Sequence, residues 1–414
     1  MAREKKGTKG VKKIKILFTT DLRDKLLFTL LMIMMFRVLS HVPVPFVNLD
    51  ALSVMGDDLF GMINLFSGGA LKNFTIMATG ISAYISASIV IQLLSYFVPA
   101  VHMMVRSPGG DKKVKKITIG LGIFNAIFSS MITTFAMHQT YHMLTSTSWY
   151  VFLTIALLHA CGTGIAIWIG ETITEKGFGN GMSLLVCINV LSSVPSMISM
   201  MNGIDVIIIA IVVCMAVLTI MLTILAETSE RRIPLFYPKA AARGKFLKDA
   251  MYFPIKLNVS GVMPIILAGY IVQFLSMLGK LDNGFGRFMA MITNSQSYVY
   301  IIGFTILVYL FTFVYALVSF DAREVSENIQ KNGAIIPGIR PGKDTTNYVK
   351  RVRKYITKMS AAYLTFVYFF PTVILTAVGA NFIQASSIII LVGVSLETCK
   401  ALKVEIELRD YKTL

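Results

Sequence analysis

Charged residues are scarce in this 414-residue sequence, and their scarcity excludes an ordinary soluble protein. Asp, Glu, Lys and Arg make up 15% of the chain, against roughly a quarter of a typical soluble domain. Hydrophobic residues make up 55%, and the mean hydropathy is +0.69. A soluble globule has too little interior to hide that much apolar surface, so we expect lipid to be the solvent for most of the chain.

Cysteine is also rare. The four cysteines, Cys161, Cys187, Cys214 and Cys399, lie within or at the end of apolar runs. They are too few and too embedded to form the disulfide framework of a secreted domain. The composition therefore predicts an all-α polytopic membrane protein.

Ten apolar runs, each of about 18–25 residues, are long enough to cross a bilayer as helices. The runs cover residues 26–45, 74–98, 117–137, 150–169, 182–201, 204–226, 259–278, 298–319, 357–378 and 384–401. Only residues 201–203 separate the fifth run from the sixth, which leaves nine spans as the alternative. The first run follows a Lys-rich arm as a signal peptide would, but no small-residue cleavage site follows it, so we expect a mature helix.

Basic residues outnumber acidic ones by 39 to 22, and their positions predict an orientation. With ten spans, 35 of the 39 fall on the side of both termini, Lys72, Lys280 and Arg287 fall in the opposite loops, and Arg37 lies inside the first run. Because Lys and Arg collect in cytoplasmic loops, we expect both termini in the cytoplasm. Nine spans would scramble this pattern.

Three stretches hold most of the positive charge: the N-terminal arm (residues 1–25) and two long loops (residues 227–258 and 320–355). In the arm, orientation and attraction to anionic lipid headgroups explain the charge as well as a partner would. The two loops are longer and more basic than orientation requires. That excess favours an acidic cytosolic partner such as ribosomal RNA.

Three functional classes compete: an ion-coupled transporter, a membrane-embedded enzyme and a passive conduit. Transporters commonly keep acidic or His residues inside their spans, and here the span interiors hold almost none. Glu171 and Glu175 flank the fourth run, Asp205 opens the sixth, and His159 is interior but alone, as a core histidine would be. These positions count against a transporter.

Enzyme motifs are missing as well. The sequence contains no G-x-x-x-x-G-K-[ST] phosphate loop and no H-E-x-x-H. His138 and His142 have the i, i+4 spacing of metal ligands, but no third ligand accompanies them, so we expect no metal. The Gly-rich residues 177–181 join two membrane helices, which favours a tight turn. A conduit without cofactor, metal or catalytic residue remains.

One segment favours a conduit directly. Residues 59–71 are apolar enough to enter a membrane, too short to cross it, and contain the Gly68–Gly69 pair, which breaks a helix. Such a segment is either re-entrant, which requires surrounding protein or a water-filled cavity, or an external amphipathic cap. Periodicity does not separate these two interpretations.

Seven motifs carry a resemblance to a known family: residues 66–71, 84–94, 168–183, 230–234, 254–264, 323–329 and 333–342. They resemble motifs of the SecY family, whose members are the central subunit of the general protein translocase. In the family these motifs belong to the plug, the second span, the fourth-to-fifth helix turn, the start of the seventh span and the two large cytoplasmic loops. They follow the family's order from about residue 20 to 410.

The resemblance implies two five-helix halves, residues 26–201 and 202–401, related by inverted pseudo-symmetry and followed by a cytoplasmic tail, residues 402–414. In the family, a ring of aliphatic side chains closes the waist of an hourglass pore. The matching positions are Ile81, Ile85, Met182, Val186, Ile266 and Ile390. Apolar side chains dewet a constriction against ions and bind no particular peptide sequence. For any one of these residues, core packing is the alternative.

The resemblance also implies a plug and a lateral gate. The plug is segment 59–71, and its expected sealing residues are Phe60, Ile63, Asn64, Leu65, Phe66, Ser67, Gly68 and Gly69. The gate lies between the second and third spans and the seventh and eighth spans, and it releases apolar client segments into lipid. Gln92 and Asn258 are candidates to hold it shut by hydrogen bonds, with ordinary interhelical bonding as the alternative.

The implied function is a channel for unfolded secretory polypeptides that carry signal sequences, in the bacterial cytoplasmic membrane. The implied partners are a SecE-like clamp subunit, the SecA ATPase, the ribosome, anionic lipids and, as an option, a SecG-like subunit. Contacts with SecA or the ribosome are expected at Arg231, Arg232, Lys239, Arg243 and Arg340. Because the chain has no nucleotide-binding motif, the driving force must come from outside it.

Three departures from the family pattern leave its specialisation open. Ala83 stands where many relatives have Pro, residues 384–387 replace a Gly-Gly-Thr-Ser sequence, and residues 107–113 replace a Glu-Gly/Arg-Arg stretch. The chain is therefore either a housekeeping channel or an accessory paralogue dedicated to a few secreted clients. The retained plug motif and the motif around Arg340 favour the housekeeping channel. A secondary solute transporter is the alternative from another class.

Overall fold

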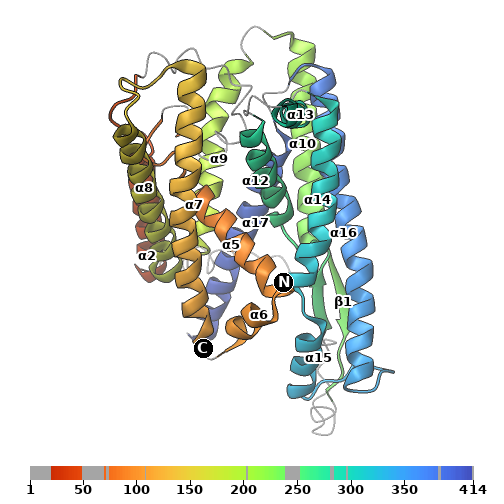
Figure 1. Ribbon diagram of the computed structural model, residues 1–414. Coiled ribbons are helices and arrows are strands. Elements are labelled where there is room, and N and C mark those ends of the chain that lie inside the picture. The colour runs from red at the N-terminus through yellow and green to blue at the C-terminus, as the bar shows by residue number, and fades with distance from the viewer. Residues whose placement is uncertain are drawn as a thin grey trace. The chain divides into compact units, whose positions relative to one another are not determined.

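In the computed structural model, a long helix forms at each of the ten spans predicted from the sequence (Figure 1). The structure describes residues 20–48, 70, 74–107, 109–201, 204–237, 252–279, 284–294, 297–380 and 384–412. The long helices are α2 (Thr20–Leu39), α5 (Gly80–Phe97), α7 (Gly110–Tyr141), α8 (Trp149–Lys176), α9 (Gly181–Met200), α10 (Val206–Thr228), α12 (Met263–Leu278), α14 (Tyr298–Ser319), α16 (Lys343–Ala377) and α17 (Ala385–Lys412). Within the described ranges, seven helices are long and apolar enough to cross a membrane, and α5 and α12 contain shorter apolar stretches.

Contacts divide the chain into two compact units. The first comprises Met1–Gly203, Lys280–Asp282 and Val394–Leu414, and the second comprises Ile204–Gly279 and Asn283–Gly393. Helix α17 therefore contributes its first residues to the second unit and the rest to the first. The prediction of two symmetry-related halves is not tested by this division and stays a prediction.

In the first unit, α8 is the helix against which α2, α5, α7 and α9 pack. Two of its glycines permit close approach. A Cβ atom on Gly162 would lie 2.1 Å from the carbonyl oxygen of Ile76, and one on Gly170 would lie 2.5 Å from Sδ of Met182. Small residues let helices approach closely in lipid, where packing rather than the exclusion of water drives association.

The second span begins as a helix later than the run 74–98 predicted. Phe74 has a φ of +45°, a left-handed conformation that interrupts any helix. The segment before α5 instead pairs with the end of the first span: Val44 N donates to Phe74 O at 3.0 Å, and Ile76 N donates to Val42 O at 3.0 Å. Helix α5 therefore starts at Gly80.

In the second unit, α14 and α16 pack along each other, α12 packs against α14, and α10 packs against α16. Aromatic rings fill the seam between α14 and α16. The ring centroids of Phe304 and Tyr368 are 4.6 Å apart, and those of Tyr300 and Phe304 are 5.9 Å apart. This buried stack joins the two helices.

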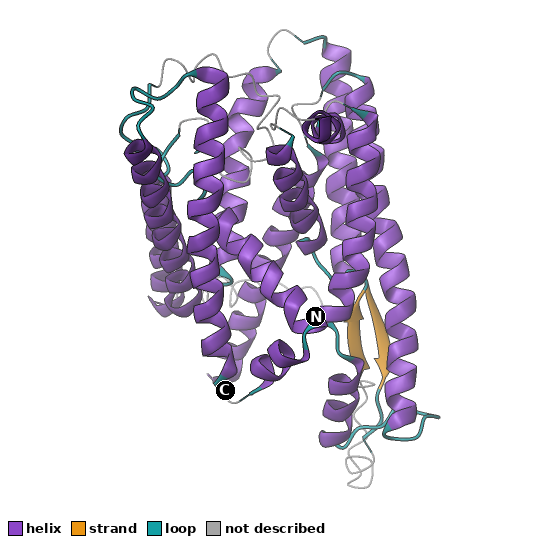
Figure 2. Cartoon of the chain, in the orientation of Figure 1, coloured by secondary structure: helices purple, strands orange, loops and turns teal. Residues whose placement is uncertain are grey.

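The two basic loops fold together in the second unit. Strands β1 (Glu230–Pro234) and β2 (Tyr252–Lys256) form an antiparallel pair, drawn as arrows in Figure 2. Helix α15 (Ala322–Lys331) packs on α16. Apolar residues of both loops share one core: Ile233, Ile255, Ala322, Ile329, Ala334, Ile336, Val349, Val352 and Ile356. We call residues 230–237, 252–256 and 320–356 the polar module.

The all-α prediction is confirmed for the ten long helices, but among the described residues it missed the hairpin and three short helices. The short helices are α6 (Pro99–Arg106), α13 (Gly284–Thr293) and α15. The hairpin was not predictable by periodicity because its strands have only five residues each and contain Arg, Glu and Lys. The ninth predicted span, residues 357–378, is the second part of α16, whose first part belongs to the polar module.

Replacing the buried ring of the α14–α16 seam tests this packing. We expect Phe304→Ala to destabilise the fold by about 3–5 kcal/mol, because Phe304 is 1% exposed and its removal leaves a cavity. Phe124→Ala, at a ring that is 65% exposed, is the matched control. Thermal unfolding in detergent measures both, and equal midpoints would contradict the packing.

Candidate functional site

The six candidate ring residues divide between the two units. In the first, Ile81 and Ile85 lie on α5, and Met182 and Val186 lie on α9. Each pair has i, i+4 spacing and therefore shares one helix face, and α5 contacts α9. Ile81 and Val186 are buried, whereas Ile85 and Met182 are half-buried.

In the second unit, Ile266 lies on α12 and Ile390 lies on α17. Both side chains are buried. A Cβ atom on Gly393 of α17 would lie 2.4 Å from Cγ1 of Val262, directly before α12. Ile266 and Ile390 each lie about one helical turn from this contact. A ring that joins all six residues involves both units and stays a prediction.

The turn between α8 and α9 determines where α9 begins, and α9 carries Met182 in its first turn. Asn180 caps α9, because its Oδ1 accepts hydrogen bonds from Met182 N at 3.1 Å and Ser183 N at 3.4 Å. Thr174 Oγ1 accepts from Gly181 N at 2.9 Å, and Thr29 Oγ1 accepts from Phe178 N at 3.0 Å. The Gly-rich residues are thus a tight helix-to-helix turn, as the sequence predicted.

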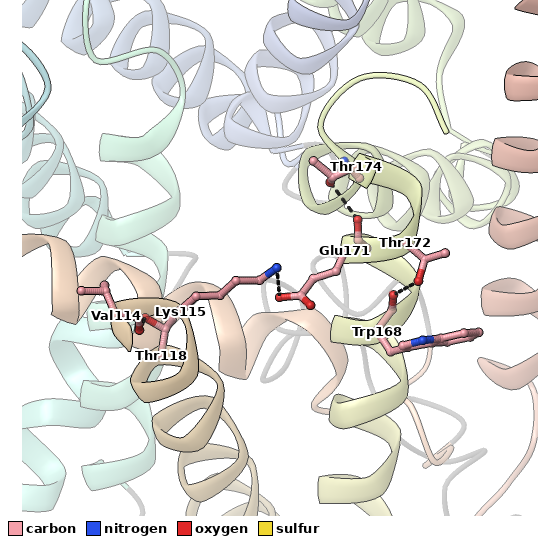
Figure 3. Close-up of polar contacts among 9 residues, drawn as sticks. Val114, Lys115, Thr118, Trp168, Glu171, Thr172 and Thr174 are labelled. Carbon is pink, nitrogen blue, oxygen red and sulfur yellow. Dashed lines mark hydrogen bonds and ion pairs between the residues drawn. The ribbon is translucent and has the colours of Figure 1, made fainter. Parts of the chain in front are cut away.

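A partly buried ion pair joins α7 and α8 close to that turn. Nζ of Lys115 lies 3.1 Å from Oε1 of Glu171 (Figure 3). On α8, Thr172 Oγ1 donates to Trp168 O at 2.7 Å and Thr174 Oγ1 donates to Gly170 O at 2.8 Å. Glu171, which the sequence placed at the end of a span, therefore pairs with a neighbouring helix.

The two lateral-gate candidates bond within their own units. Gln92 Nε2 donates to Ser88 Oγ on the same helix at 3.4 Å. Asn258 is buried and donates to Glu227 Oε1 at 2.7 Å. Glu227 was not predicted as a partner of Asn258, because a hairpin separates the two residues in sequence and only the fold brings them together. The gate role of both residues stays a prediction.

The expected SecA or ribosome contacts at Arg231, Arg232 and Arg340 lie exposed on the polar module. Arg232 is held in place: its Nε donates to Glu230 Oε1 at 2.9 Å, and its guanidinium lies 4.5 Å from the ring centroid of Tyr252. Phe236 and Ile335 exchange two backbone hydrogen bonds of 2.8 Å and so tie the hairpin to the second loop. Both basic loops therefore present their arginines from one folded body.

Some predicted residues lie outside the described ranges. These are Lys239 and Arg243 of the first basic loop and the whole set of plug residues, Phe60, Ile63, Asn64, Leu65, Phe66, Ser67, Gly68 and Gly69. Their roles stay predictions.

Three histidines, His138, His142 and His159, contact neighbouring side chains. The rings of His138 and His142 meet edge to face with centroids 5.8 Å apart. His159 is buried in α8, where its Nδ1 and the Oγ of Ser130 are 2.7 Å apart. In the part of the chain that the structure describes, no three His, Cys, Asp or Glu residues gather as a metal site would require.

Comparisons by sequence and by structure each find proteins that are similar to this chain. The SecY family model matches residues 75–399. The protein translocase subunit SecY of Streptomyces scabiei is 32% identical, with 95% of this chain and 97% of the relative covered, and that of Thermotoga maritima is 32% identical, with 95% and 94% covered. A solved protein-conducting channel matches with a TM-score of 0.67 at 17% identity, covering 94% of this chain and 93% of the other. Sec61 in the canine ribosome-channel complex matches with a TM-score of 0.64 at 15% identity, over 94% and 93%.

The cap of α9 is open to a direct test. We expect Asn180→Ala to lower the free energy of unfolding by about 1 kcal/mol, because two backbone N–H groups of α9 lose their acceptor. Asn332→Ala, at an exposed position after α15, is the control and should change stability little. Chemical denaturation in detergent compares the two variants, and an equal loss in both would argue against the cap.

Proposed function

The chain belongs to the SecY family, and on that premise we propose that it forms a protein-conducting channel of the bacterial cytoplasmic membrane. The channel passes unfolded secretory polypeptides across the bilayer and releases transmembrane segments sideways into lipid. The match of the SecY family model over residues 75–399 is the observation that carries this proposal. The chain performs no catalysis of its own and takes its driving force from a partner.

The six aliphatic residues close the channel at rest. A ring of Ile81, Ile85, Met182, Val186, Ile266 and Ile390 presents hydrocarbon to the pore, and water leaves such a constriction because nothing there binds it. Ions are excluded with the water. A moving polypeptide passes because aliphatic side chains make no directional bond that its sequence has to match.

The plug seals the channel and the lateral gate opens it toward lipid. We assign the plug to segment 59–71 and the gate to α5 and α7 on one side and α12 and α14 on the other, with Gln92 and Asn258 near its end. An apolar client segment leaves through this gate because each buried CH₂ group gains about 0.8 kcal/mol. The resemblance to the family motifs supports these assignments.

The polar module faces the cytoplasm, together with both termini. The excess of Lys and Arg on that side supports this orientation. Arg231, Arg232 and Arg340, with Lys239 and Arg243, receive the SecA ATPase or a translating ribosome. The fold shared with Sec61, solved in a ribosome-channel complex, supports the ribosome as a partner. A SecE-like clamp, a SecG-like subunit and anionic lipids complete the assembly.

A polar residue in the ring should loosen the resting seal. We expect Ile266→Asn or Ile390→Asn to raise ion conductance and to admit clients with weak signal sequences, because an amide wets the constriction. Ile306→Asn, on an exposed face of α14, is the matched control. Conductance of the reconstituted channel measures the effect, and values equal to the original would remove these residues from the ring.

Charge reversal on the polar module should block partner engagement. We expect Arg340→Glu to reduce SecA-driven export at least tenfold while the variant still inserts into the membrane, because it repels an acidic docking surface. Arg287→Glu makes the same charge change at another exposed arginine, outside the module, and should export normally. Export into inverted vesicles distinguishes them. Normal export by Arg340→Glu would exclude this arginine from the mechanism.

A further inference from the structure

Helices α10, α12, α14 and α16 are connected in sequence to the polar module, and α12 has the longest non-helical connection to it. Helix α10 is followed by β1 after Ser229 alone, α14 is followed by α15 after Phe320 and Asp321, and α16 runs from the module into the span without a break. Between β2 and α12, by contrast, lies a non-helical linker, residues 257–262. The position of α12 relative to the module therefore depends on what holds this linker.

Asn258 holds the linker by using every donor and acceptor position of its side-chain amide. Its Nδ2 donates to Glu227 Oε1 at 2.7 Å and to Gly261 O at 3.1 Å. Its Oδ1 accepts from Ser360 Oγ at 3.2 Å and from Ser260 Oγ at 3.4 Å. An amide offers two donors and two acceptor positions, so one side chain joins the end of α10, the linker and α16.

Burial makes this junction hard to open. Asn258 is 5% exposed and Glu227 is 9% exposed, so water does not readily replace the bonds that are lost. The base of the hairpin adds a backbone bond, from Leu257 N to Ser229 O at 2.8 Å. The side chain of Tyr363 on α16 also bonds the carbonyl oxygen of Leu222 on α10. The linker is thus anchored to two helices that are themselves joined.

We propose that Asn258 and Glu227 form a clasp that positions the first turn of α12 on the polar module and keeps it in the resting position. Asn258 is a positioning residue: it acts through α12, which carries Ile266. Release of the clasp frees α12 to move while the module stays folded on its own core. The link to channel closure rests on the proposed function, in which Ile266 belongs to the seal.

The test uses an exchange of partners between the two positions. Asn258→Asp removes both donors and places a second carboxylate beside Glu227. In the double variant Asn258→Asp/Glu227→Gln, the amide at position 227 donates to the carboxylate at position 258. The bond is thus restored with its direction reversed, and the net charge is the original one. Asn347→Asp, at an exposed position of α16 in the module, is the control for the charge change. Ser360→Ala removes a single bond to the same amide and serves as the milder variant if Asn258→Asp does not fold.

Two measurements on the full chain in proteoliposomes, hydrogen–deuterium exchange and resting ion leak, test whether the clasp exists and whether it controls the seal. We expect Asn258→Asp to speed hydrogen–deuterium exchange of residues 257–266 about tenfold or more, as the loss of a charge-assisted buried bond implies. Exchange in β1, β2 and α15 should stay unchanged. Resting ion leak should rise, and the double variant should return both quantities toward the original. Ser360→Ala should shift both in the same direction, by less.

Three other results would overturn the clasp or separate it from the ring. Unchanged exchange at residues 257–266 means that Asn258 does not hold α12. Faster exchange without leak, where Ile266→Asn does leak, means that the clasp does not control the seal. If neither variant leaks, the ring assignment fails, and the exchange result alone decides whether the clasp exists.

Discussion

A peptide group in hydrocarbon has no water to bond, and this constraint governs the membrane part of the chain. A helix satisfies its own backbone groups, so apolar runs of sufficient length become helices whatever their side chains. Side chains then decide only how the helices pack. Gly162 and Gly170 let other elements reach the backbone of α8, and the rings of Phe304 and Tyr368 fill the seam between α14 and α16.

The same constraint explains the polar side chains at breaks between helices. At the turn from α8 to α9, Thr29, Thr174 and Asn180 accept hydrogen bonds from N–H groups that no helix satisfies. In the linker before α12, Asn258 bonds the carbonyl oxygen of Gly261 and the side chains of Glu227, Ser260 and Ser360. At these two breaks, polar side chains therefore replace the hydrogen bonds that a continuous helix would have made.

The polar module obeys the rule of soluble domains instead. Its apolar residues alternate with charged ones and gather into a core of their own, which leaves Arg231, Arg232 and Arg340 exposed. Basic loops without such a core would have to order on binding and would lose affinity by doing so. A folded module presents its charges in place, which suits the docking role proposed for it.

Composition and hydropathy determined the class of protein and the approximate limits of the spans, because these depend on transfer of each residue from water to lipid and not on neighbours. The distribution of Lys and Arg then favoured ten spans over nine. Motif order identified the family. The sequence also predicted the tight turn at residues 177–181. It did not predict the hairpin, the late start of α5 at Gly80, the pairing of Lys115 with Glu171, or the bond between Asn258 and Glu227. Each of these depends on residues distant in the chain, and only the packed structure decides which polar groups share a buried position.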